Sequence, residues 1–421
     1  MMIVLDDEQR QAVESNARKI LVVAGAGSGK TRVLTERVKR LLLDGVEPHN
    51  IVCITFTNLA SQEMRERLCD VPGIGDVFIG TIHSFANRVY KESGIDYELL
   101  TTDKEMELYR NELMLFGDYE FLTFKRFVQF MDLEKQVAEG KYDEEELSSF
   151  LMPSERADLR VAERKIREVC KKRNILTFDE LLEKTTEYYA QLGAEIEHVL
   201  VDEFQDVGTL EANFIFGLNA KNLFLVGDDW QSIYGFKGGN VGIFKRLLKE
   251  EGWTVCYLEN NYRNTTEIVG LAETVIAQVD DRLSKQVKVM NQAKGVICID
   301  TKYSLDRWLD EIKSSPRLKD WFILTRTNKE VMEIAEKLEQ KGIAYTGFKR
   351  SGVTLQEMKE LLMQDNVKLL TVHTSKGLEN KNVLLYGNFP VKQKRFIVND
   401  EERKVMYVGI TRAMEQLVLL N

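Results

Sequence analysis

Apolar residues along this chain follow two alternating patterns, one typical of buried strands and one typical of helices. Short runs rich in β-branched residues predict strands, and they lie at residues 20–24, 51–57, 198–201, 296–300 and 321–328. Between them, apolar residues recur every three or four positions, as in 58–68 and 331–342, which predicts amphipathic helices. Strands that alternate with helices predict an α/β fold built from parallel sheets flanked by helices.

Four segments carry local predictions. Residues 77–90 are strand-like, with His83 at their polar end. Asn58 is placed to cap the helix that follows it. A first amphipathic helix carries Gln9, which composition alone assigns to the surface. Near the C-terminus, Arg412 falls at a loop or at a helix start before a last strand.

The character of the chain changes between residues 91 and 174. This stretch is helical in pattern, strongly charged and without a buried-strand signal, so we predict an inserted helical domain. Within it, residues 160–173 are dense in Lys and Arg on one helix. A solvated helix face is the favoured interpretation, because Glu163 and Glu168 interrupt the charge; a surface that follows nucleic-acid phosphates is the alternative.

Composition adds limits to this picture. A chain of 421 residues can hold several domains, and 44% hydrophobic with 30% charged residues is typical of a globular protein. No run of about 18 apolar residues occurs and the N-terminal stretch is acidic, so we expect a cytoplasmic protein without a membrane partner. A net charge of −9 argues against a protein that coats nucleic acid over its whole surface, so any such site must be a local groove.

The five cysteines have no metal-binding or paired spacing. They lie far apart, with no CxxC pair and no histidine at zinc-finger distance. We therefore expect reduced, buried core residues at Cys53, Cys69, Cys170, Cys256 and Cys298.

The strongest chemical signal is ILVVAGAGSGKT at residues 20–31, a strand followed by a small-residue loop and a helix. Such a loop turns backbone N–H groups onto phosphates, Lys30 reaches the β- and γ-phosphates, and the Thr31 hydroxyl ligates Mg²⁺. The strict P-loop pattern has Gly where this chain has Ala24. A plain glycine-rich turn is the alternative, and the acidic pair downstream argues against it.

That acidic pair is Asp202-Glu203, at the end of the predicted strand 198–201. An ATPase needs one carboxylate to hold Mg²⁺ and another to accept a proton from the attacking water. Asp202 and Glu203 are the respective candidates.

Two further segments add polar and aromatic candidates. In WQSIYGFKGG, Gln231 is placed to sense the γ-phosphate, and Trp230, Tyr234 and Phe236 could stack on unpaired bases, although at least one of them is expected in the core. In NYRN, Arg263 is a candidate to stabilise phosphate charge and Tyr262 a candidate to stack on adenine.

Taken in order, these segments resemble the motifs of the UvrD/Rep-like superfamily 1A DNA helicases over nearly the whole chain. The matching segments are AGAGSGKT, ITFTNLASQEM, GTIHSF, VDEFQD, VGDDWQSIYGFKGG, NYRN, LLTVHTSKGLE and YVGITRA, with Gln9 as the adenine-reading glutamine. In that family an alanine at the position of Ala24 is usual. The resemblance implies two RecA-like P-loop lobes with an inserted helical subdomain.

The resemblance implies an ATP site shared between the lobes, with ATP and Mg²⁺ as cofactors. The implied catalytic residues are Lys30, Glu203, Gln231, Arg263 and Arg412. The implied ATP-binding residues are Gln9, Ala24, Gly25, Ala26, Gly27, Ser28, Gly29, Lys30, Thr31, Tyr262 and Glu379, the last at the ribose. Thr31 and Asp202 are the implied metal ligands.

It also implies a DNA site and a domain plan. The implied DNA contacts are Thr57, Asn58, His83, Tyr234, Phe236, Arg326, Thr371 and His373. The expected parts are a first lobe at 1–88 and 176–265, the helical insertion at 89–175, and a second lobe at 266–421. The large fourth subdomain, 2B, is expected to be missing, because only a short segment separates GIAYTG from KLLTVHTSKG.

Several positions depart from the family pattern. Leu59 replaces a usual Lys, Trp230 a usual Asp, Lys237 a usual Arg, and Val207-Gly208 a usual Thr-Asn. None of these positions belongs to the phosphate chemistry, so the grip on DNA is where we expect a difference.

The resemblance implies an ATP-dependent helicase or translocase that moves 3′ to 5′ on single-stranded DNA and acts at single-strand/duplex junctions, in repair, replication or recombination. We expect a monomer. The alternative is a DNA-sensing ATPase subunit that partners a nuclease, in repair or phage defence, without unwinding DNA itself. A strand-exchange ATPase is disfavoured, because it would not need a second lobe with its own arginine.

Overall fold

The computed structural model describes residues 5–113, 124–138, 153–193, 196–235, 239–347, 360, 361, 363–387 and 400–421. These residues divide into two compact units. The first falls within Met1–Thr81, Ile196–Val207 and Ala220–Asn421, and the second within Ile82–Glu195 and Gly208–Asn219. Both six-stranded sheets belong to the first unit.

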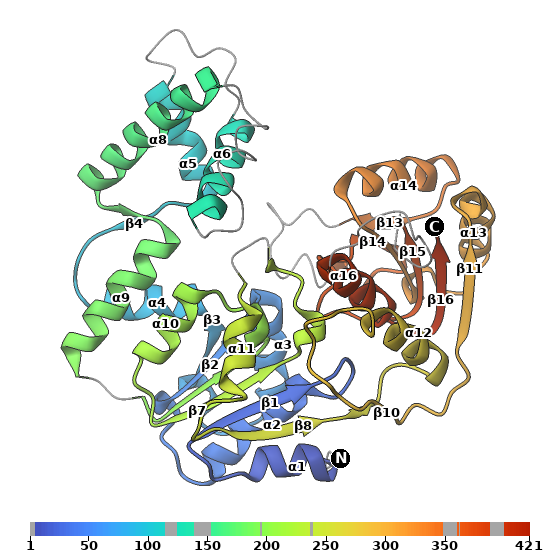
Figure 1. Cartoon of the computed structure of the whole chain (residues 1–421), viewed down its shortest axis with the longest axis horizontal. Helices are drawn as coiled ribbons and strands as arrows, with labels where there is room; N and C mark the ends of the chain where they lie inside the picture. The colour runs from blue at the N-terminus through green and yellow to red at the C-terminus, as the bar shows by residue number, and fades with distance from the viewer. Residues whose placement is uncertain are drawn as a thin grey trace. The chain divides into compact units, whose positions relative to one another are not determined.

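The first sheet is parallel throughout, in the order β3-β2-β6-β7-β1-β8. Its strands are β1 Lys19–Ala24, β2 Ile51–Thr55, β3 Phe78–Thr81, β6 His198–Val201, β7 Asn222–Gly227 and β8 Thr254–Leu258. Ile20, Val22 and Ala24 share one face, because side chains alternate along a strand. Against that face pack α1 Asp7–Glu14, α2 Lys30–Leu43 and α3 Asn58–Leu68. We call this sheet with its helices, including α11 Val241–Leu247, the first lobe (Figure 1).

The second sheet is also parallel, in the order β11-β16-β15-β12-β14-β13. Its strands are β11 Val296–Asp300, β12 Trp321–Thr325, β13 Tyr345–Gly347, β14 Val367–Thr371, β15 Asn380–Tyr386 and β16 Ala413–Leu420. One face packs on α12 Thr266–Ile276 and α16 Asp400–Ile410, and the other on α13 Leu305–Lys313 and α14 Asn328–Gln340. This is the second lobe (Figure 1).

The two lobes are joined covalently and by a shared apolar core. A short parallel pair, β9 Asn260–Asn261 with β10 Lys288–Val289, lies where the chain passes between them. Trp230, Ile233 and Tyr234 of the first lobe belong to the same buried cluster as Val372 and Tyr407 of the second. The residues that follow β7 therefore lie at the lobe interface.

The second unit is helical. Its helices are α4 Ile82–Lys91, α5 Thr102–Leu113, α6 Phe124–Ala138, α8 Pro153–Arg173, α9 Phe178–Leu192 and α10 Thr209–Gly217. A two-residue parallel pair, β4 Glu98–Leu99 with β5 Ile175–Leu176, is the strand content that the structure describes there. The helix predicted at 160–173 forms the C-terminal part of α8. Along it, Arg167 pairs with Glu163 at 2.6 Å and Arg160 with Glu134 at 2.8 Å.

The α/β prediction, with parallel sheets flanked by helices, is confirmed. The strand predicted over 77–90 is wrong beyond Thr81, because Ile82–Lys91 forms α4. Ile82, Phe85, Ala86, Val89 and Tyr90 are its buried residues, which is a helical spacing hidden behind a β-branched start.

Two smaller predictions also need correction. Thr57, not Asn58, caps α3: its side chain accepts a hydrogen bond from the Ala60 amide at 3.1 Å, and Asn58 is the first helical residue. Arg412 follows the end of α16, so the loop is confirmed and the helix start is wrong.

All five cysteines are free, and the predicted burial is confirmed for three of them. Cys53, Cys170 and Cys256 are buried, whereas Cys69 is exposed and Cys298 is half-buried. Among the residues that the structure describes, none of the helices has both the length and the apolar composition that crossing a membrane requires.

Candidate functional site

The loop after β1 is held in a fixed shape by its own hydrogen bonds. Ser28 Oγ donates to the Gly25 carbonyl at 2.9 Å, and Lys30 Nζ to the same oxygen at 3.4 Å. Gly27 and Gly29 have φ of 67° and 87°, a conformation that side chains rarely adopt. A Cβ on Gly29 would also lie 2.7 Å from Gln9 Nε2. Both glycines are therefore required by geometry.

Gln9 lies behind this loop, in α1. It is 1% exposed, and its Nε2 donates to the Ser28 carbonyl at 3.0 Å. Together with Asp6 it forms a capping box at the start of α1. Composition alone predicted that Gln9 is a surface residue. That prediction is wrong, because the Gln9 side chain is buried and its amide supports the loop from inside.

Tyr262 lies on the other side of the loop. Its amide donates to the Gly27 carbonyl at 3.0 Å, and its hydroxyl bonds to Asp6. Burial and the neighbouring Asp6 carboxylate raise the pKa of Tyr262 to about 12. The Tyr262 side chain nevertheless stays 41% exposed, which leaves it accessible to a planar ligand.

The acidic pair follows β6 directly. Asp202 is 6% exposed, and Glu203 has a left-handed backbone with φ of 52°, unusual for a residue with a side chain. Burial, and then the neighbouring Glu203 charge, raise the pKa of Asp202 to about 7. Burial acts on Glu203 in the same direction, but Lys30 and Lys376 outweigh it and lower the pKa of Glu203.

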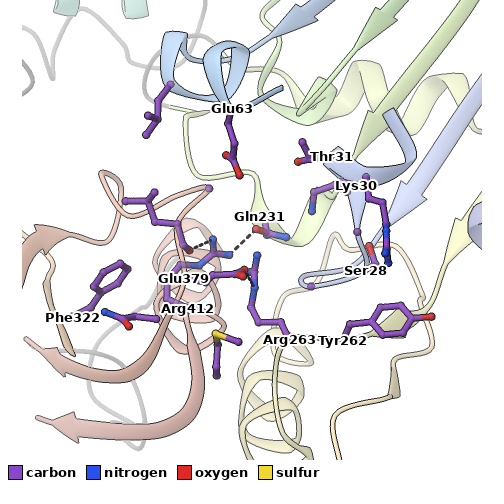
Figure 2. Close-up of a pocket in the computed structure, with 18 of the residues that line it drawn as sticks. Ser28, Lys30, Thr31, Glu63, Gln231, Tyr262, Arg263, Phe322, Glu379 and Arg412 are labelled. Carbon is purple, nitrogen blue, oxygen red and sulfur yellow. Dashed lines mark hydrogen bonds and ion pairs between the residues drawn. The ribbon is translucent and has the colours of Figure 1, made fainter. Parts of the chain in front are cut away.

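Gln231 connects the two lobes at this site. Its Nε2 donates to Asp228 at 2.5 Å, and its Oε1 accepts from Arg412 of the second lobe at 2.9 Å (Figure 2). Gln231 is 3% exposed, so its orientation is set by these two partners.

Arg412 is deeply buried, at 1% exposure. Besides Gln231, it donates to the carbonyls of Val408 at 3.0 Å and Leu378 at 3.1 Å. Burial, and then the nearby Arg263, lower the pKa of Arg412 below its usual value. Arg263 in turn forms an ion pair with Glu379. Two guanidinium groups thus lie close enough to repel each other, an arrangement that an anionic ligand would stabilise.

One cavity of about 660 Å³ is lined by Lys30, Glu203, Gln231, Tyr262, Arg263, Glu379 and Arg412, among others. Figure 2 shows Lys30 and Thr31 on one side of it and Arg263, Glu379 and Arg412 on the other. Arg32, which also lines the cavity, was missed by sequence reasoning; it directly follows the P-loop threonine, which was the available signal.

A buried ion pair also crosses between the lobes. Lys376 pairs with Asp206, and their side chains are 5% and 0% exposed. Its ammonium also donates to the Gln231 carbonyl at 2.7 Å and lies 5.2 Å from the centre of the Tyr234 ring. Sequence reasoning missed Lys376, because its partner is 170 residues away.

Two predicted DNA contacts meet beside that pair. The Tyr234 hydroxyl donates to the His373 carbonyl at 2.9 Å, and the Tyr234 ring stacks on Phe56 at 5.0 Å. Tyr234 is 2% exposed, which argues against an open stacking surface in this arrangement. Trp230, the other aromatic offered for stacking, is 4% exposed and belongs to the core. Phe236 and Lys237 lie outside the described residues.

The remaining predicted DNA residues lie at strand ends. Thr57 follows β2 and caps α3, with Asn58 exposed beside it. Thr371 ends β14, and its hydroxyl lies 2.9 Å from that of Thr374. Arg326 follows β12 and makes a bidentate ion pair with Glu402 of α16.

His83 belongs to the second unit. It lies on α4, half-buried, with its ring edge-on to Phe178 at 5.1 Å and 77°. Phe178 is 42% exposed, so an aromatic pair reaches the surface of that unit.

Comparisons with known proteins place the chain in a family. A family model described as the UvrD/REP helicase N-terminal domain matches residues 5–251. A second, described as the UvrD-like helicase C-terminal domain, matches residues 256–352 and 348–421.

Curated relatives cover most of the chain. DNA helicase II of Escherichia coli strain K12 is 30% identical over 388 residues, which are 85% of this chain and 53% of that protein. ATP-dependent DNA helicase PcrA of Leuconostoc citreum is 27% identical over 99% of this chain and 57% of its own length. A probable DNA helicase of Mycoplasma pneumoniae is 27% identical over 99% of this chain and 83% of its own length. The chain thus spans about half the length of the first two.

Proposed function

The chain belongs to the UvrD/REP helicase family, and from this premise we propose that it is an ATP-dependent motor that moves 3′ to 5′ on single-stranded DNA and separates duplex or displaces bound proteins. The observation that carries the proposal is the hydrogen bond from Arg412 of the second lobe to Gln231 of the first, at the edge of the P-loop cavity. A triphosphate in that cavity would contact both lobes, so its γ-phosphate could control how they close.

The residues present fit a magnesium ion. Thr31 lines the cavity, and the pKa of the buried Asp202 carboxyl is raised to about 7 by burial and by Glu203, so a cation nearby would stabilise its ionised form. Mg²⁺ takes few protein ligands and completes its coordination with phosphates and water, so one hydroxyl and one carboxylate would be enough to hold it. When bound, it would neutralise phosphate charge.

The remaining roles follow from charge and position. Lys30 starts α2, where backbone N–H groups and its ammonium would hold the β- and γ-phosphates. Glu203, kept ionised by Lys30 and Lys376, would accept the proton of the attacking water. Arg263 and Arg412 would stabilise the charge that develops on the transferred phosphoryl group.

DNA would bind where the lobes meet, near Phe56, Tyr234 and His373. Tyr234 contacts both Phe56 and His373. The Lys376 ammonium lies against the Tyr234 ring and pairs with Asp206, which is four residues after Asp202. A change at the nucleotide would therefore alter the packing around Tyr234, and this supports alternating grip on the strand.

The test is steady-state ATP hydrolysis by the purified chain with Mg²⁺, with and without single-stranded DNA. We expect strong stimulation by DNA, loss of turnover when Mg²⁺ is chelated, and unwinding of duplexes that carry a 3′ tail but not a 5′ tail. Stimulation without unwinding would favour the DNA-sensing ATPase that partners a nuclease. The absence of any stimulation would overturn the proposal.

A further inference from the structure

A short strap returns from the second lobe to the turn after β7. It comprises residues 283–285, between α12 and β10 (Figure 1). The Leu283 amide donates to Asp229 Oδ2 at 2.8 Å, and Trp230 Nε1 donates to the Leu283 carbonyl at 3.0 Å. The strap is therefore attached to this turn by hydrogen bonds in both directions.

Lys285 ends the strap in a buried position. Its side chain is 4% exposed, and its ammonium lies 2.5 Å from Asp228 and 2.7 Å from Asp229. The same ammonium lies 4.5 Å from the centre of the Trp230 ring. Trp230 is the residue that departs from the family pattern, and here it supplies an aromatic face to a desolvated cation.

Asp228 is shared between this lysine and the P-loop lysine. The carboxylate is 0% exposed, and Lys30 Nζ lies 3.7 Å from it, farther than Lys285. Burial raises the pKa of Asp228, but Lys285 and Lys30 outweigh burial and keep it lowered. The carboxylate is therefore ionised, and it needs at least one cation because a buried unpaired charge is strongly unfavourable.

That requirement conflicts with phosphate binding. Lys30 cannot neutralise Asp228 and a phosphate equally well, because its single ammonium has a limited number of donors. If Lys285 satisfies Asp228, Lys30 is free to turn to the nucleotide.

We propose that Lys285 is a positioning residue for the ATP site: it neutralises Asp228 and so leaves the Lys30 ammonium available to phosphate. This inference rests on the function proposed above. Lys285 does not touch the nucleotide in this proposal, and it acts through Asp228.

The experiment measures KM for ATP and kcat, with single-stranded DNA, for Lys285→Met, Lys285→Arg and the double variant Lys285→Met/Asp228→Asn. We expect KM to rise roughly tenfold in Lys285→Met while kcat changes less than about threefold, because binding and not the transition state is affected. Lys285→Arg keeps the charge and is expected near the wild-type KM. The double variant removes the demand for a cation, so its KM should return toward wild type. Lys288→Met is the matched control, because this lysine is 52% exposed in the same segment.

Calorimetric binding of ADP separates this inference from the proposed function, since it needs neither DNA nor turnover. Weaker ADP binding by Lys285→Met, restored in the double variant, supports the inference even if DNA does not stimulate the wild type. Unchanged KM and ADP affinity in a folded Lys285→Met would overturn it. So would a double variant no better than the single one, because that result means a merely structural strap. If Lys285→Met does not fold, the double variant decides. Its KM for ATP overturns the inference if it is more than about tenfold above the wild-type value, and supports the inference if it is within about threefold of that value.

Discussion

The two lobes end one strand each in the same four-residue turn, and they differ in what that turn presents. Thr55-Phe56-Thr57-Asn58 begins with the last residue of β2, and Thr325-Arg326-Thr327-Asn328 begins with the last residue of β12. In both, the first threonine hydroxyl donates to the carbonyl of the second at 3.0 Å. In both, the second threonine caps the next helix, accepting from an amide at 3.1 Å and 3.2 Å.

The residue between the threonines is what changes. Phe56 stacks on Tyr234 at 5.0 Å, whereas Arg326 pairs with Glu402. One backbone arrangement therefore offers an aromatic surface in the first lobe and a cation in the second. The nucleotide cavity is divided as well: the first lobe supplies the phosphate loop and Glu203, and the second supplies Glu379 and Arg412, so neither lobe holds a complete site.

The largest effect is expected in the first lobe, from Lys30→Ala. Loss of the ammonium should lower ATP turnover by at least about 10³-fold, because one preorganised charge at a phosphoryl group contributes that much. Binding of single-stranded DNA should persist. Lys39→Ala, on an outer position of α2 where the side chain is 28% exposed, is the control. Substantial turnover in Lys30→Ala would show that this lysine is wrongly assigned.

Lys376→Met tests the ion pair that joins the lobes. It leaves Asp206 buried without its partner, so the free energy of unfolding should fall by about 3–5 kcal/mol. The pKa of Asp206, which burial already raises to about 6, should rise further. The unpaired Asp206 destabilises the folded state only while it is ionised, and a larger fraction of it is protonated at the lower pH. The loss of unfolding free energy relative to wild type should therefore be larger at pH 7.5 than at pH 5.5. Thermal unfolding at both pH values measures this, and equal deficits would contradict it.

Arg412→Lys tests the contribution of the second lobe to hydrolysis. The charge remains, but the planar fork that reaches Gln231, Val408 and Leu378 is lost. We expect kcat to fall about 10²-fold while ADP binding, measured by calorimetry, changes little. A variant that binds ADP poorly and keeps its kcat would reverse the roles assigned to the two lobes.

Arg326→Ala and Phe56→Ala compare the two turns directly. Phe56→Ala should weaken single-stranded DNA binding by roughly tenfold, since a base stack contributes about 1–3 kcal/mol. Arg326→Ala should weaken it to a similar extent, through the loss of a phosphate contact. Only Arg326→Ala should reduce the slope of log affinity against log salt, by roughly one phosphate contact. Affinity measured between 50 and 200 mM salt separates the two, and identical slopes would mean that the turns do not differ in how they bind.

The smallest effects are expected at the caps. Thr57→Val and Thr327→Val should each lower the free energy of unfolding by about 1 kcal/mol, because each leaves one helix amide without its acceptor. Similar falls in the thermal midpoint would confirm that the two turns are equivalent as structures. Asn58→Ala, which removes the residue first taken for the cap, should cost less than Thr57→Val.

Local information in the sequence was enough for the parallel α/β architecture, for the phosphate loop and for the carboxylates at a strand end. These features depend on neighbours along the chain. Runs of β-branched residues predict the strands, and the positive φ angles that the loop requires explain why Gly27 and Gly29 occupy it. Where local signals competed, the prediction failed, as at Ile82–Lys91, where a β-branched start concealed a helix.

Contacts between distant residues were decided by tertiary structure alone. Lys376 meets Asp206, Arg412 meets Gln231, and Lys285 meets Asp228, across 170, 181 and 57 residues. The reason is physical: a buried charge must find its partner in space, and the folding of two sheets against each other determines which partner is there. The sequence by itself determined the chemistry that each lobe carries, and the packing of the lobes determined which of those groups act together.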